Sequence, residues 1–119
     1  MNVITPLVQF QQQMRIFHWQ TDSFAQHKAF GKIYESLDGF VDEYVETYMG
    51  IFGKSKPTTT FNITLLPLED ESVVTNVLED FIEYLKEMSF EIEDHSDLLN
   101  IRDSILGEVN KLKYLLTLS

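Results

Sequence analysis

Apolar residues recur at spacings of three and four along most of this 119-residue chain. That period places side chains along one stripe of an α-helix. In the first segment the stripe consists of Val3, Leu7, Phe10, Met14 and Phe17. The sequence therefore predicts an all-α chain in which each helix buries one stripe against its neighbours.

Three further helices are expected downstream. The second covers about residues 24–52, with Ser23 as its N-cap and Gly53 directly after its last turn. The third begins near Asp70, and its stripe continues to Ile92. The fourth follows a short break and takes Ser96 as its N-cap.

The connection at residues 54–69 differs from the rest, because its prolines, threonines and β-branched residues do not continue a helix. Extended at ~3.3 Å per residue, it spans about 53 Å. That reach exceeds the ~45 Å of the second helix. We therefore expect a ferritin-like four-helix bundle with a long crossover between helices 2 and 3, which lie parallel. A plain up-and-down bundle with a flexible loop is the alternative.

Composition narrows the classes of function. The chain is expected to form a single domain, residues 1–119, with one core and no disulfide, because it has no cysteine. A net charge of -10 disfavours nucleic-acid partners and is compatible with attracting cations. The sequence has neither a leader pattern at its start nor an apolar run of membrane-spanning length, so we expect a soluble cytoplasmic protein.

Two histidines and two carboxylates form the candidate metal site. His18 lies near the end of the first helix, and His27 lies in the first turn of the second. On that second helix Asp42 and Glu46 are one turn apart, so both can reach one cation. Imidazole nitrogen with carboxylate oxygen suits iron, and also manganese or zinc.

These four residues cannot share a metal within one chain, because His27 and Asp42 are about 22 Å apart along one helix. Two copies of the helix packed antiparallel about a two-fold axis would bring the histidine end of one copy to the acidic end of the other. The site therefore requires a homodimer or a higher homo-oligomer.

The same residues resemble a family signature. The run from His18-Trp19 to His27, followed by Asp42-x-x-x-Glu46, is similar to the signature of Dps, the mini-ferritins. The resemblance implies that His18 and His27 of one subunit and Asp42 and Glu46 of another bind iron. It also implies oxidation of ferrous iron, typically by peroxide, and storage of ferric mineral inside a shell of subunits. The chain further resembles small phage-encoded ferritin-like proteins.

A second hypothesis is a ferritin-like bundle without metal chemistry that serves as a structural or partner-binding module. Gly31 favours this second hypothesis, because Dps proteins carry an aspartate at that position. The interval between His18 and His27 also favours it, because it is three residues shorter than is usual in Dps proteins. DNA protection without iron is a third possibility, which the net charge disfavours.

Trp19 is expected to anchor a core or an interface. The third-helix carboxylates, Asp80, Glu87 and Glu91 among them, are expected to face solvent.

Overall fold

The computed structural model describes residues 2–54 and 60–118. In this part of the chain all regular structure is helical, as the apolar stripes predict. The long helices are α1 (Ile4–Gln20), α2 (Phe24–Phe52), α3 (Glu71–Glu87) and α5 (Ser96–Leu115), and α4 (Ser89–Ile92) is a single turn between α3 and α5. Residues 55–59 of the expected crossover lie outside the described residues.

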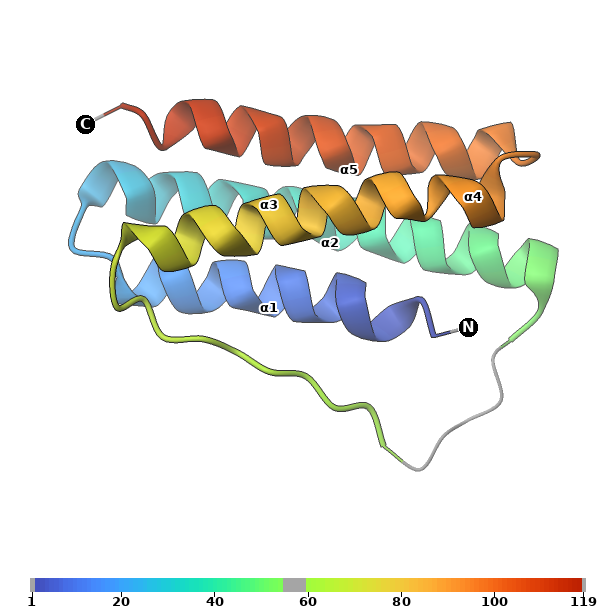
Figure 1. Ribbon diagram of the computed structural model, residues 1–119, viewed down its shortest axis with the longest axis horizontal. Helices are drawn as coiled ribbons and strands as arrows, with labels where there is room; N and C mark the ends of the chain where they lie inside the picture. The colour runs from blue at the N-terminus through green and yellow to red at the C-terminus, as the bar shows by residue number, and fades with distance from the viewer. Residues whose placement is uncertain (1, 55–59, 119) are drawn as a thin grey trace.

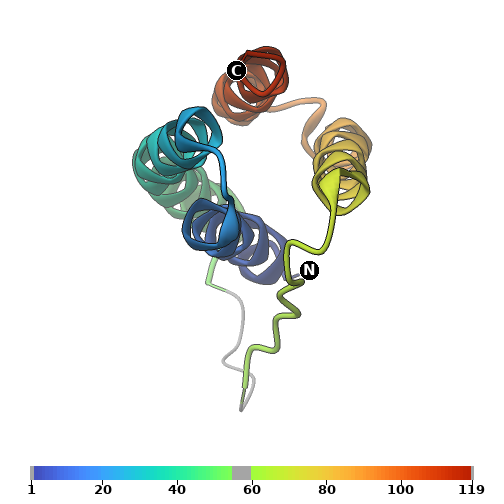
Figure 2. The same cartoon turned by 90° about the vertical axis from the view of Figure 1, so that its left-hand side faces the viewer.

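The four long helices run side by side, and the direction of each follows from its connection. Short links make α1 antiparallel to α2 and place α5 antiparallel to α3, whereas the crossover returns along the molecule and leaves α3 parallel to α2 (Figure 1). Viewed end-on, α2 and α3 lie diagonally opposite each other, with α1 and α5 between them (Figure 2). The long crossover is thus present, and the plain up-and-down alternative is wrong.

The core is formed by the predicted stripes. Its largest fully buried side chains include Phe17 on α1, Phe30, Leu37 and Tyr44 on α2, and Leu85 on α3. The burial of apolar surface along every long helix supplies the main driving force for this arrangement.

Local signals at the ends of α2 act as expected. The Ser23 hydroxyl accepts a hydrogen bond from the backbone N–H of Gln26 at 3.2 Å, which makes Ser23 the N-cap. Gly53 ends the helix with a φ of 84°, a backbone conformation that favours glycine, and its N–H donates to the carbonyl of Met49.

Two predictions in the second half of the chain are wrong. The third stripe is buried as far as Ile92, as expected, but the helix that carries it is not continuous and breaks at Met88. There the Arg102 guanidinium donates to the carbonyl of Leu85 at 2.7 Å and to the hydroxyl of Ser89. In a continuous helix the Leu85 carbonyl would accept from the backbone N–H of Ser89, so Arg102 takes the place of a helical hydrogen bond. The N-cap of α5 is His95, not Ser96, and it makes no side-chain capping bond.

The described crossover residues are extended and attached to α1 through glutamines. The Gln13 side chain accepts from the N–H of Leu66 at 2.7 Å and donates to its carbonyl at 2.8 Å. Gln9 accepts from the N–H of Thr64 at 2.9 Å, and Gln20 from that of Leu68 at 2.7 Å. Side-chain amides thus provide hydrogen-bond partners for the backbone of an extended segment that has no neighbouring strand. None of the described helices is long and apolar enough to cross a membrane.

Candidate functional site

His18 and His27 form a reciprocal pair. Their rings are stacked, with centroids 3.8 Å apart and planes 16° from parallel. Nδ1 of His18 lies 2.6 Å from the carbonyl oxygen of His27, and Nδ1 of His27 lies 2.7 Å from that of His18. A carbonyl oxygen only accepts, so each Nδ1 carries a proton and donates it. In the neutral rings both Nε2 atoms therefore keep a free lone pair, as a metal ligand requires.

The short link between α1 and α2 positions this pair. The carbonyl of His18 belongs to the last turn of α1, where backbone acceptors have no partner within the helix. The Thr21 hydroxyl accepts from the N–H of Ser23 at 3.1 Å and fixes the turn. With Ser23 capping the next helix, the His27 side chain is directed back toward the end of α1.

Gly31 leaves room for the His18 ring because it has no side chain. A Cβ at this position would lie 2.8 Å from Cε1 and 2.9 Å from Nδ1 of His18, which is closer than real carbon atoms approach. The His18 ring therefore occupies the space that an aspartate would need at position 31. The absence of a side chain at position 31 and the ring position of His18 are thus one structural feature.

A hollow of about 400 Å³ opens over the pair and is lined by His18, His27, Lys28, Gly31, Lys32 and Glu35. The two lysines make this end of the α2 surface basic. Beside it, the Arg15 guanidinium lies 4.8 Å from the Trp19 ring centroid and 5.0 Å from that of Tyr34. Trp19 is 61% exposed, so it is not a core anchor in this chain.

Asp42 and Glu46 are both exposed on α2, one turn apart. Neither makes a hydrogen bond or ion pair to another described residue. Within residues 2–54 and 60–118, no three histidine or acidic side chains lie close enough together to hold a metal ion. The single chain thus brings together His18 and His27 and leaves Asp42 and Glu46 apart from them.

The part of the chain that matches a protein family includes His18, His27, Asp42 and Glu46. A family of unknown function (DUF5856) matches residues 18–116. The chain belongs to this family. A relative, described as an uncharacterized 14.6 kDa protein in the mobD-ri intergenic region of Enterobacteria phage T4, is 29% identical over 101 residues, 85% of this chain and 74% of the relative. No solved structure matches.

A second group of polar residues in this DUF5856 chain was missed by the sequence analysis. The hydroxyl of Tyr48 donates a short hydrogen bond to the carboxylate of Glu91. Burial, and then the nearby charge of Glu91, raise the pKa of Tyr84 to about 12, and burial with the Glu91 hydrogen bond raises that of Tyr48 to about 12. Glu91 is half-buried and does not face solvent as expected, whereas Asp80 and Glu87 are exposed as expected. Its spacing from Asp80, Tyr84 and Glu87 was the available signal.

Proposed function

We propose that the protein is a Dps-like member of the ferritin-like class that binds ferrous iron at a site shared by two copies and oxidises it. The observation that carries this proposal is the reciprocal histidine pair. Metal-binding histidines commonly donate the second ring nitrogen to a backbone carbonyl, which fixes the tautomer and directs the free nitrogen at the metal. Here each ring donates its Nδ1 proton to a backbone carbonyl in this way.

The charge along α2 favours a two-fold partner. Lys28 and Lys32 lie on the half of the helix near His27, and Asp42 and Glu46 lie on the other half. Antiparallel packing of two α2 helices, centred near Glu35, places the basic half of each copy against the acidic half of the other. The same packing completes two identical sites, each with two imidazoles from one copy and two carboxylates from its partner.

Iron is the substrate in this proposal, and peroxide is the oxidant. Two ferrous ions each give up one electron, and one hydrogen peroxide molecule with two protons becomes two water molecules. The imidazole and carboxylate ligands also suit manganese and zinc, which would compete for the site. Zinc would not reduce peroxide, because it has no redox chemistry. The lysines beside the histidines are neutralised by the partner's carboxylates, which lowers the repulsion of an incoming cation.

The second candidate is a dimeric structural or partner-binding module without metal chemistry. Two observations favour it: Gly31 removes one carboxylate that Dps proteins have, and Lys28 and Lys32 place positive charge beside the pair. It predicts the same two-fold dimer but no metal dependence.

Anaerobic titration with ferrous iron, followed by peroxide, distinguishes the candidates. The proposal predicts saturable binding and fast growth of ferric absorbance, both lost in His27→Ala and in Glu46→Ala. His95→Ala is the matched control, because His95 lies at the start of α5 and outside the pair. Unchanged iron binding and oxidation in both site variants would exclude the assignment.

A further inference from the structure

One face of α3 and α4 carries three acidic residues and a tyrosine. Asp80, Tyr84 and Glu87 are spaced by four and three residues, so they line one side of α3. Glu91 follows on α4 and lines the same cavity as Tyr84 and Glu87. Two cavities open along this row and share Tyr84 as a lining residue. We call these two cavities, which adjoin at Tyr84, the α3 groove.

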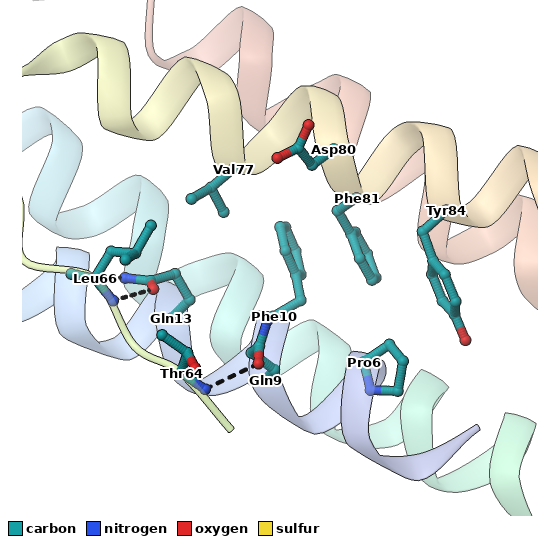
Figure 3. A pocket seen from close by; sticks show the side chains of 10 residues that line it. All are labelled: Pro6, Gln9, Phe10, Gln13, Thr64, Leu66, Val77, Asp80, Phe81 and Tyr84. Atoms are coloured by element: carbon teal, nitrogen blue, oxygen red, sulfur yellow. Dashed lines mark hydrogen bonds between the residues drawn. The ribbon is translucent and has the colours of Figure 1, made fainter. Parts of the chain in front are cut away.

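The first cavity, of about 290 Å³, has an aromatic floor and one free carboxylate. The rings of Phe10 on α1 and Phe81 on α3 stack with centroids 3.8 Å apart (Figure 3). Gln9 and Gln13 hold the crossover against its side through Thr64 and Leu66 (Figure 3). The carboxylate of Asp80 makes no hydrogen bond or ion pair to any described residue.

The second cavity, of about 190 Å³, is lined by Val3, Tyr44, Tyr84, Glu87, Met88 and Glu91. Tyr44 is 1% exposed, yet its hydroxyl has no hydrogen-bond partner within the described part of the chain. In that part of the chain, every side-chain oxygen or nitrogen without solvent access has a hydrogen-bond partner. The Tyr44 hydroxyl has no partner, so it must keep some accessible surface. We place that surface in the cavity that Tyr44 lines. A buried polar group without a partner is costly unless something in the cavity bonds to it.

The lining of the α3 groove contains acceptors and no cation. Neither cavity is lined by a lysine, arginine or histidine among the described residues. Arg102, which is close to Tyr44, is already bound to the carbonyl of Leu85, to Ser89 and to Asp103. Burial raises the pKa of Tyr44, so its hydroxyl stays neutral and able to accept at physiological pH.

We infer that the α3 groove binds a linear aliphatic polyamine. Ammonium groups fit its carboxylates and tyrosine hydroxyls, and methylene chains fit the stacked phenylalanines between them. Asp80 and Glu87 are about 10 Å apart along the helix. An extended zigzag chain advances about 1.25 Å per single bond, so the nine bonds of a triamine such as spermidine span about 11 Å and cover that distance. A bare metal ion fits less well, because no three acidic or histidine ligands converge in the described chain.

The inference is independent of the iron proposal, because the α3 groove shares no lining residue with the hollow over the histidines. Calorimetric titration at physiological salt, which screens non-specific attraction, tests it with spermidine and with 1,4-diaminobutane. We expect one saturable site per chain that prefers the triamine by at least about tenfold. Asp80→Asn, Glu87→Gln and Tyr44→Phe should each weaken spermidine binding by about fivefold.

Glu83→Gln is the matched control, because it removes the same charge from an exposed position of α3 that lines neither cavity. It should leave spermidine affinity unchanged, and magnesium at equal charge should not displace the triamine. The melting temperature of each variant establishes that it is folded. Equal losses in Glu83→Gln and Glu87→Gln, or the absence of a saturable site in the wild-type protein, would overturn the inference.

Discussion

The imidazole of His18 donates to the backbone carbonyl of His27, and the imidazole of His27 donates to that of His18. Each side chain thus fixes the tautomer of its own ring by using the main chain of the other residue. The pair joins the end of α1 to the start of α2 and leaves the Nε2 atom of each ring without a hydrogen bond to any described residue.

Gly31→Ala should retain the fold but weaken metal binding by about tenfold or more, because the new methyl group displaces the His18 ring. Metal titration of the folded variant measures the effect. Gly107→Ala is the control, since a Cβ there meets nothing within 4 Å. That control should raise the free energy of unfolding by about 0.5–1 kcal/mol, because alanine favours a helix interior over glycine. Wild-type metal affinity in Gly31→Ala would show that the ring position of His18 is irrelevant.

Arg102→Met should lower the free energy of unfolding by about 1–3 kcal/mol, because the carbonyl of Leu85 loses its charged donor at the break between α3 and α4. Urea denaturation provides the measurement. Lys113→Met removes an exposed ion pair with Glu79 and should cost less than about 1 kcal/mol. Similar losses in the two variants would contradict the role given to Arg102.

Gln13→Ala should detach part of the crossover from α1, because two hydrogen bonds to Leu66 are lost. We expect a loss of about 1–3 kcal/mol in unfolding free energy and faster amide hydrogen exchange at residues 64–68. Gln12→Ala serves as the comparison, since Gln12 makes no hydrogen bond to the described crossover. Unchanged exchange rates in Gln13→Ala would refute the attachment.

Stability should fall in alkali between about pH 10 and pH 12. In the folded chain, burial and the Glu91 hydrogen bond raise the pKa of Tyr48 from 10.0 to about 12. A raised pKa means that the folded state favours the protonated phenol, so its contribution is complete below pH 10 and disappears as the pH rises through the folded-state pKa. Urea denaturation at a series of pH values measures this loss, and Tyr48→Phe should show a smaller one. An identical pH profile in that variant would argue against the Tyr48–Glu91 bond.

Periodicity was sufficient to predict the helices, because each apolar stripe has a single way to be buried. The length of the crossover likewise predicted that α3 runs parallel to α2. The break at Met88 was not predictable, since it depends on Arg102, fourteen residues further along the chain. Tertiary contacts overrode a continuous local pattern at this point.

The candidate site was predictable only in part. Spacing placed Asp42 and Glu46 on one face of α2, and both are exposed there. Spacing could not show that His18 and His27 stack, or that Gly31 is needed for the His18 ring, because both facts depend on how closely α1 approaches α2. Trp19 was expected to anchor a core or an interface; its ring is exposed in the single chain and lies against Arg15, so the core alternative is wrong.

Mixing two inactive variants tests the shared site most directly. His18→Ala/His27→Ala lacks the imidazoles, and Asp42→Ala/Glu46→Ala lacks the carboxylates, so each alone should fail to bind and oxidise iron. In a two-fold dimer formed from one copy of each, one of the two sites has all four ligands. An equimolar mixture, exchanged through mild denaturation, should therefore recover about a quarter of the wild-type sites. A mixture that forms mixed dimers yet stays as inactive as its components would contradict the account.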